Sequence, residues 1–326
     1  MGRGRKAVGG IFAAAAAAAT VRAAVARPPE PPPAPPGRPD RYGWRHAEIF
    51  HTIRGDGAPA LLLHDLYTGA SGLEMAPLGD QLAEEFRIYT ADLPGFGRSG
   101  RPSMRYGPDF FFDAIVEFVR HVIERPTLLI GCGLSAAYAT EAAVRLGNLV
   151  SGVVMLAPPE AEGPGLLEAP TWRPLVYQGL RSPLGAAYHW WHASPGWRKT
   201  SLRRLLAVEP ADLETRAEQL SRSARQPGGR WALWSLWSGD LAWDPRPALA
   251  RLGAPALVLW GSEAQTNPLA PEHYHAVRPD ITQQVVPGTA RWPHVDAPDT
   301  VAAEIKRWWA AEGPANAPSP NPTSEE

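Results

Sequence analysis

The stretch 127–147, TLLIGCGLSAAYATEAAVRLG, decides the fold. Its apolar run, TLLIG at 127–131, is typical of a buried β-strand, and the alanine-rich pattern from Ser135 to Leu146 is typical of a helix. The residues between them are mostly small, so the chain can turn sharply from the strand into the helix. The stretch therefore predicts a strand–turn–helix unit, with one residue presented at the carboxyl end of the strand.

Short apolar runs and helical patterns also alternate on both sides of this unit. Such alternation predicts an α/β fold with a mostly parallel, doubly wound sheet. The strand pattern stops between about 159 and 252, so this segment is predicted to be an inserted helical cap. Runs that suit further strands occupy 60–64, 87–92, 150–158 and 255–261, and the alternating stretch 47–53 suits an early edge strand.

The segment predicted as the cap is rich in tryptophan. Trp231, Trp234 and Trp237 recur every third residue and therefore share one helix face. Such a stripe is more typical of a cap's own core than of a ligand contact. A helical insertion over the carboxyl ends of strands is nevertheless where an apolar pocket forms in open α/β sheets, so a small hydrophobic ligand is expected beneath it.

The two ends of the chain differ in composition from the folded part. Residues 1–26 join a basic start to an alanine-rich apolar stretch, which predicts a signal-like or membrane-anchoring segment. The proline-rich stretch 27–41 predicts an extended linker, residues 42–311 the folded domain, and the polar tail 312–326 disorder. Membrane association or export through 1–26 is therefore expected, with a cytoplasmic location as the alternative.

Composition excludes several classes of function. The formal net charge of −1 argues against a nucleic-acid partner, which usually requires a basic face. Cys132 is the single cysteine, so neither an intrachain disulfide nor a zinc site built on several cysteines is expected. The spacing of His273 and His275 does not place two ligands on one helix face. No metal and no cofactor is predicted.

Five motifs in order make the chain resemble the α/β-hydrolase family with a helical cap, over about residues 43–310. LLLHDLYTGAS (61–71) looks like the family's oxyanion loop, DLPGFGRSGRP (92–102) like its D-x-x-G-x-G-x-S turn, and GCGLS (131–135) like its nucleophile elbow. PALVLWGSEAQTNP (255–268) and PGTARWPHVDAP (287–298) look like the segments that carry the acid and the base. The resemblance implies the fold and, in an intact member, a Ser–acid–His hydrolase.

The elbow can be aligned in two registers, which decide whether a nucleophile is present. With Gly133 at the nucleophile position, the next strand begins 17 residues later at Val150, as the resemblance implies. With Ser135 there, the helix would need a two-residue deletion. We favour Gly133, which leaves no nucleophile, and interpret Ser135 as a residue of the helix N-terminus, where serine is well suited.

The acid and base positions are changed as well. The alignment places Ala264 at the acid position and Arg291 at the base position, and arginine stays protonated near neutral pH. An active enzyme would have to use Ser135 as nucleophile, His294 as base and Glu263 as acid. Two further candidates for the acid, after the strand that ends near Pro158, are Glu160 and Glu162.

The oxyanion loop carries His64 and Asp65 where the resemblance implies His-Gly. The resemblance implies that the backbone N–H groups of Leu66 and Leu134 are the oxyanion donors, and a carboxylate beside them would repel a developing oxyanion. Arg291 is expected to point into the pocket with His64 and Asp65. Because a buried arginine needs a counter-charge, Asp65, Glu160 or an anionic ligand is expected beside it.

These changes favour an α/β-hydrolase-fold protein that has lost the triad and is not an enzyme. It is expected to bind a small apolar or carboxylate-bearing ligand under the tryptophan-rich cap. The alternative is an esterase-like hydrolase that uses Ser135 and His294. A third hypothesis is proton transfer by His64 or His294 in chemistry other than hydrolysis.

Overall fold

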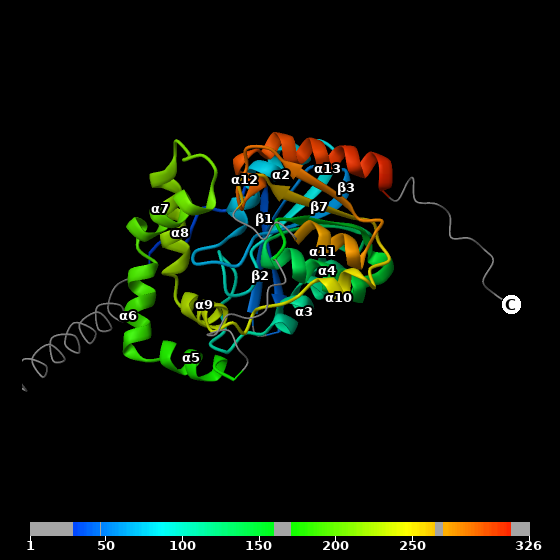
Figure 1. Ribbon diagram of the computed structural model, residues 1–326. Helices are drawn as coiled ribbons and strands as arrows, with labels where there is room; N and C mark the ends of the chain where they lie inside the picture. The colour runs from blue at the N-terminus through cyan, green and yellow to red at the C-terminus, as the bar shows by residue number, and fades with distance from the viewer. Residues whose placement is uncertain (1–28, 46, 160–170, 265–269, 314–326) are drawn as a thin grey trace, which may run out of the picture.

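The computed structural model describes residues 29–45, 47–159, 171–264 and 270–313. They form one eight-stranded sheet with helices on both faces and a helical cap at one end (Figure 1). The segment 1–26 and the tail from 314 onwards lie outside the described residues. No helix within the described ranges is long and apolar enough to cross a membrane.

The sheet has the strand order β1-β2-β4-β3-β5-β6-β7-β8. β2 runs antiparallel to both β1 and β4, and every pairing from β4 to β8 is parallel. The prediction of a mostly parallel, doubly wound α/β sheet is therefore confirmed. The strands are β1 (Arg38–Trp44), β2 (Ala47–Arg54), β3 (Ala58–Leu63), β4 (Phe86–Ala91), β5 (Thr127–Cys132), β6 (Val150–Leu156), β7 (Ala256–Gly261) and β8 (Thr282–Val286).

The edge strand β1 begins at Arg38, inside the segment 27–41 that was predicted as a linker. Proline can occupy an edge strand because no second neighbour needs its missing N–H, so Pro39 pairs with Thr52 without breaking the sheet. The chain before β1 also packs on the domain, since the Arg98 side chain donates to the Pro32 carbonyl at 2.7 Å. The predicted linker is too long, and β1 replaces β2 as the edge strand.

Each buried strand places alternate side chains in two separate cores. On one face, Leu61, Leu129 and Val153 pack with helices α3 (Pro108–Phe118) and α4 (Leu134–Leu146). On the other, the intervening Leu62, Leu128 and Val154 pack with helices α2 (Ala76–Leu82) and α13 (Pro298–Glu312). This period of two explains why the strands of a sheet covered on both faces read as continuous apolar runs.

The helices on the two faces separate clearly in Figure 1, with α2, α12 and α13 together on one side and α3, α4, α10 and α11 on the other. Several elements of the two helix layers, and of the turns beside them, are short. Those elements are η1 (Gly72–Met75), the π-helical turn η2 (Val119–Ile123), η3 (Gly147–Leu149), α10 (Arg246–Leu249), α11 (Ala270–Val277) and α12 (Pro293–Asp296).

The cap lies between β6 and β7, as predicted, and consists of helices. Serine side chains cap two of them, since Ser182 and Ser194 accept backbone N–H groups of the first turns of α6 and α7. Figure 1 shows the cap at one end of the sheet, with α5 and α6 at its outer rim. Its helices are α5 (Arg173–Leu180), α6 (Pro183–His192), α7 (Pro195–Leu205), α8 (Leu213–Ala224) and α9 (Gly229–Trp237).

Candidate functional site

The turn from β5 into α4 places Gly133 at the carboxyl end of the central strand. Gly133 has φ 54° and ψ −125°, a conformation that side chains disfavour and glycine adopts readily. Its N–H donates to the Leu156 carbonyl of the neighbouring strand β6 at 2.9 Å. The sharp strand–turn–helix unit expected from the sequence is therefore built around a residue without a side chain.

The Asp65 carboxylate fills the space in front of this turn. Its Oδ1 accepts the backbone N–H of Leu66 at 2.8 Å and the backbone N–H of Leu134 at 2.9 Å. A Cβ atom on residue 133 would overlap the Asp65 carboxyl carbon and both carboxylate oxygens. The two N–H groups expected to hold an oxyanion thus converge on a carboxylate of the chain itself, and that carboxylate stands where a side chain on residue 133 would project.

A second carboxyl group, that of Glu74, lies beneath Asp65. Glu74 Oε1 accepts the Asp65 N–H at 2.6 Å, and the Tyr67 hydroxyl is hydrogen-bonded to the same carboxyl group. Burial, and after it the nearby charge of Asp65, raise the pKa of Glu74 well above its usual value. A raised pKa favours the neutral form of Glu74, which carries no second negative charge beside Asp65.

His64 braces the oxyanion loop and has no free ring nitrogen. Its Nε2 accepts the Leu93 N–H at 3.0 Å, so the proton resides on Nδ1, which donates to the Asp65 carbonyl at 2.7 Å. Burial lowers the pKa of His64, so this neutral form persists. Because both nitrogens serve the backbone, the arrangement opposes the hypothesis of His64 as a proton-transfer group.

Ser135 does not form the nucleophile–base pair that the alternative requires. Its hydroxyl is fully buried, accepts the Cys132 N–H at 3.0 Å, and lies 3.0 Å from the Leu63 carbonyl and 2.9 Å from the Cys132 carbonyl, to one of which it donates. The hydroxyl ties the first turn of α4 to the ends of β3 and β5. The Ser135–His294 hydrogen bond that the alternative requires is not among the hydrogen bonds of the described residues.

His294 instead belongs to a buried group that sequence reasoning missed. One ligand atom each from Glu74, Cys132 and His294 lies within 4.8 Å of the others, and Glu74 Oε1 is 3.9 Å from His294 Nε2. Neither ring nitrogen of His294 has a hydrogen-bond partner among the described residues. Carboxylate, thiolate and imidazole are ligands that Zn²⁺ accepts, so these three side chains could hold a metal ion, contrary to the expectation of no such group.

Burial of His294 gives a testable dependence of stability on pH. Burial lowers the pKa of His294 from 6.5 to about 3. Below pH 6.5 the His294 side chain is therefore protonated in the unfolded chain, whereas in the folded protein it stays neutral until about pH 3. The free energy of unfolding consequently falls as the pH is lowered from 6.5 to 3. Replacing His294 with glutamine should reduce the slope of unfolding free energy near pH 5 by about 1.4 kcal/mol per pH unit.

Urea unfolding of wild type and His294→Gln at pH 7, 6 and 5 measures this slope. His121→Gln is the matched control, because the His121 side chain is exposed in η2, the turn that follows α3. Equal slopes for wild type and His294→Gln would mean that His294 is protonated in the folded protein and would contradict the expectation.

Arg291 does not point into the space beside Asp65. Its side chain is exposed and lines an open hollow of about 700 Å³, whose other walls include Arg203, Glu263 and Ala264. Asp65 makes no ion pair with it, because the carboxylate is satisfied by backbone N–H groups. The expected burial of Arg291 against Asp65 is therefore wrong, although Ala264 and Arg291 do face one hollow. Glu160 and Glu162 lie outside the described residues.

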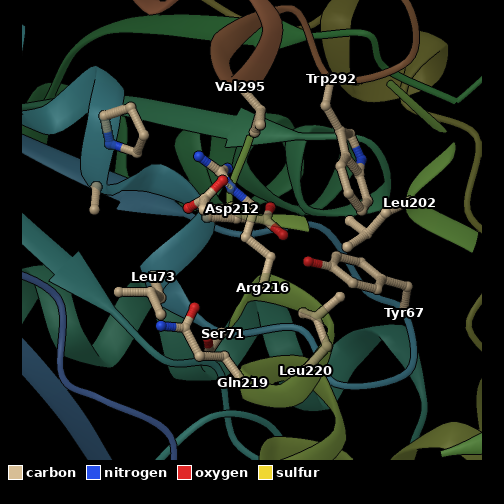
Figure 2. A pocket seen from close by; sticks show the side chains of 13 residues that line it. Tyr67, Ser71, Leu73, Leu202, Asp212, Arg216, Gln219, Leu220, Trp292 and Val295 are labelled. Atoms are coloured by element: carbon tan, nitrogen blue, oxygen red, sulfur yellow. Dashed lines mark hydrogen bonds and ion pairs between the residues drawn. The ribbon is translucent and has the colours of Figure 1, made fainter. Parts of the chain in front are cut away.

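A separate pocket of about 220 Å³ lies between the cap and the core (Figure 2). Tyr67 and Trp292 stack beside it with ring centroids 4.6 Å apart, and Arg216 reaches into it from α8, where it pairs with Asp212 at 2.7 Å. Its other lining residues are Ser71, Leu73, Glu74, Ala76, Pro77, Leu202, Gln219, Leu220 and Val295.

The tryptophans of the cap do not line this pocket. Several of them contact one another, as Trp191 contacts Trp197 and Trp231 contacts Trp234, with ring centroids 4.4 and 5.1 Å apart. Trp234 is buried, whereas Trp172 and Trp191 are about half exposed. Trp292, which follows β8, is the tryptophan of the pocket wall. The interpretation of the stripe as cap core rather than as a ligand contact therefore fits the observed packing.

A buried arginine fastens the cap to the oxyanion loop. Arg198 of α7 donates to the carbonyls of Thr68 at 3.0 Å and of His192 at 2.9 Å. The Thr68 hydroxyl also lies 3.1 Å from His192 Nδ1. Because burial lowers the pKa of His192 to about 4, this ring is neutral and tolerates the adjacent guanidinium. The cap thereby covers the loop that carries Asp65.

Comparisons with known proteins agree with this architecture. The sequence profile described as "Alpha/beta hydrolase family" matches residues 60–304. A pimeloyl-[acyl-carrier protein] methyl ester esterase from Edwardsiella ictaluri is 26% identical over 79% of this chain and 96% of its own length. A (lyso)-N-acylphosphatidylethanolamine lipase from Mus musculus is 24% identical over 77% of this chain and 79% of its own.

Solved structures share the fold at lower identity. The 2-hydroxy-6-oxo-6-phenylhexa-2,4-dienoate hydrolase from Rhodococcus sp. strain RHA1 superimposes with a TM-score of 0.66 at 17% identity, over 84% of this chain and 98% of the other. A bacterial membrane phospholipase A superimposes with a TM-score of 0.63 at 20% identity, over 84% and 86% of the two chains.

Proposed function

The chain belongs to the alpha/beta hydrolase family, and from that premise we propose that it is a binding protein without the family's serine chemistry. In this proposal Gly133, Ala264 and Arg291 stand at the nucleophile, acid and base positions. The ligand is small and largely apolar, and it occupies the pocket between Tyr67 and α8. The relatives are named as esterases and a lipase. The proposal gives this chain the same fold as these relatives but no hydrolase activity.

The single observation that carries the proposal is the position of the Asp65 carboxylate. An acyl-transfer site needs its two N–H donors free for the oxygen that becomes negative in the transition state. Here both donors, on Leu66 and Leu134, are already bonded to Asp65 Oδ1. A negative group in that place opposes a second negative oxygen by like-charge repulsion, and it also takes the room of any side chain on residue 133.

The pocket supports an amphiphilic ligand of modest size. Leucine, proline, valine and tryptophan side chains supply most of its apolar wall, and the Tyr67 hydroxyl, Gln219 and Arg216 supply hydrogen bonds. Arg216 carries the positive charge that a carboxylate-bearing ligand would need, although it must exchange or share its partner Asp212. An apolar body with one polar or carboxylate end fits these walls.

A combined turnover and binding experiment tests the proposal. We expect the purified full chain to hydrolyse p-nitrophenyl butanoate and hexanoate no faster than buffer, and Ser135→Ala to behave identically. Hexanoate should nevertheless change the tryptophan fluorescence through Trp292 in a saturable titration. Leu220→Trp, which fills the pocket, should abolish that change, whereas Val285→Trp on the exposed face of β8 should leave it intact.

The second candidate function is an esterase-like hydrolase, and the names of the relatives favour it. It would require Ser135 to leave its backbone partners and reach the neutral imidazole of His294. Turnover in the wild-type protein that Ser135→Ala abolishes would establish this candidate and refute the binding protein. Absence of both turnover and hexanoate binding would refute the proposed ligand class.

A further inference from the structure

The cap carries an exposed apolar row on α6. Leu184, Tyr188 and Trp191 are 67%, 43% and 52% exposed, and their spacing of four and then three residues places them on one face of the helix. Tyr188 and Trp191 contact each other with ring centroids 5.9 Å apart. An amphipathic helix normally buries such a row, but the described residues leave each of these three side chains at least 43% exposed.

The row continues onto α5, which Figure 1 places beside α6 at the outer rim of the cap. Trp172 and Leu175 are 51% and 63% exposed and lie three residues apart at the start of α5. Of the nine large apolar side chains exposed within the described residues, four lie on these two helices and a fifth, Trp172, immediately precedes α5. Single exposed apolar residues are ordinary, but a cluster of this kind marks an interaction surface. We call these five residues the rim patch.

Charge distinguishes the segment that holds the rim patch from the rest of the chain. Residues 171–208 contain six Lys/Arg and no Asp/Glu, which leaves 26 Lys/Arg against 33 Asp/Glu elsewhere. Arg181, between α5 and α6, and Arg204, at the end of α7, are exposed. Lys199 and Arg203 pair with acids of the neighbouring segment, Glu214 and Glu209. The patch is thus apolar, with the exposed Arg181 between its two helices, and it belongs to a segment without acidic residues on an otherwise acidic protein.

We propose that the rim patch docks the protein on an anionic lipid surface. Trp and Tyr have an apolar body and a polar tip, which suits the boundary between lipid headgroups and acyl chains, and leucine enters the apolar side of that boundary. Basic residues beside an interfacial helix add attraction to anionic lipids. The inference does not rest on the proposed function or on residues 1–26, because α5 and α6 alone provide the surface.

A lipid surface accounts for the patch better than a protein partner does. The apolar residues project from two short helices at the edge of the cap, and none of them lines the pocket or the open hollow described above. Exposed Trp, Tyr and Leu side chains insert shallowly into an interface that deforms around them, whereas a protein partner would need a complementary surface. The proximity of the pocket-lining helices α7 and α8 would then bring the pocket near the membrane.

Sedimentation with vesicles tests the proposal on the full chain. We expect binding to vesicles of phosphatidylcholine mixed equally with phosphatidylglycerol, and weaker binding to phosphatidylcholine alone. Leu184→Gln combined with Trp191→Gln should lower the partition coefficient for the anionic vesicles about tenfold or more. The matched control, Val208→Gln with Val285→Gln, removes two equally exposed apolar side chains away from the patch and should leave binding unchanged.

Two other measurements keep the test decisive. Far-UV circular dichroism and the melting temperature should match wild type for both double variants, because all four side chains are exposed. Unchanged vesicle binding by Leu184→Gln/Trp191→Gln would overturn the proposal. A second outcome would also overturn it. Light scattering would show that the wild type is a dimer and this variant a monomer, while vesicle binding stays unchanged. The rim patch would then join two copies of the chain.

Discussion

Replacing Gly133 with alanine is expected to destabilise the protein by about 4–9 kcal/mol. A non-glycine residue at φ 54° and ψ −125° stores about 1–3 kcal/mol of backbone strain. The new Cβ must also displace the Asp65 carboxylate from the N–H groups of Leu66 and Leu134, and hydrogen bonds to a charged group are worth about 1.5–3 kcal/mol each. Urea unfolding of the full chain measures the loss.

Gly147 provides a matched control for the backbone term. It has φ 55° and ψ −118° at the other end of α4, nearly the conformation of Gly133, and a Cβ there would meet no heavy atom of the described chain within 4 Å. Gly147→Ala should therefore cost the strain alone, about 1–3 kcal/mol. The difference between the two alanine variants isolates the contribution of the Asp65 carboxylate.

A double-mutant cycle then identifies the cause. Asp65→Gly removes the atoms that a Cβ on residue 133 would overlap, so Asp65→Gly/Gly133→Ala should be more stable than the sum of the single changes predicts, by about 2 kcal/mol. Additivity within about 0.5 kcal/mol would contradict the packing described here. It would mean that the Asp65 side chain moves aside at little cost in free energy and does not restrict residue 133 to glycine.

The sheet and the turn could be predicted from the sequence because each depends on local signals. The apolar runs and the helix beginning near Ser135 fixed the strand–turn–helix unit, and counting from Gly133 to Val150 chose its register without reference to distant residues. Ser135, three residues after the end of β5 at Cys132, was interpreted as a residue of the helix N-terminus, and its hydroxyl accepts the backbone N–H of Cys132. Such inferences need only periodicity, turn chemistry and spacing.

The remaining features depend on contacts between distant segments. Glu74 reaches Asp65 because η1 packs beside the oxyanion loop, and His294 meets Cys132 and Glu74 because α12 packs against η1 and β7. Nothing near these residues in the sequence marks the meeting. The sequence indicated that a carboxylate at Asp65 would oppose an oxyanion, but it could not indicate that the carboxylate would accept both donors. The exposure of Arg291 could not be predicted for a related reason. It depends on the direction in which the loop between β8 and α12 turns.

The proposed function predicts that introducing the residues of an intact family member at four positions creates esterase activity. Asp65→Gly frees the N–H groups of Leu66 and Leu134, Gly133→Ser supplies a nucleophile in the space that the carboxylate leaves, and Ala264→Asp with Arg291→His supplies an acid and a base in one hollow. Hydrolysis of p-nitrophenyl acetate by this quadruple variant is expected to exceed that of wild type by about 10²–10³-fold.

The matched control carries Gly133→Ala in place of Gly133→Ser and keeps the other three substitutions. It has the same strain at residue 133 and the same open donors but no hydroxyl, so it should show no turnover above buffer. Variants lacking only Asp65→Gly should also stay inactive, because the carboxylate would still hold both N–H groups. A correctly folded quadruple variant no faster than this control would show that the chain has lost more than these four side chains. Wild-type turnover equal to that of the quadruple variant would refute the claim that the carboxylate of Asp65 closes the site, since the family's chemistry would then run with the oxyanion donors occupied.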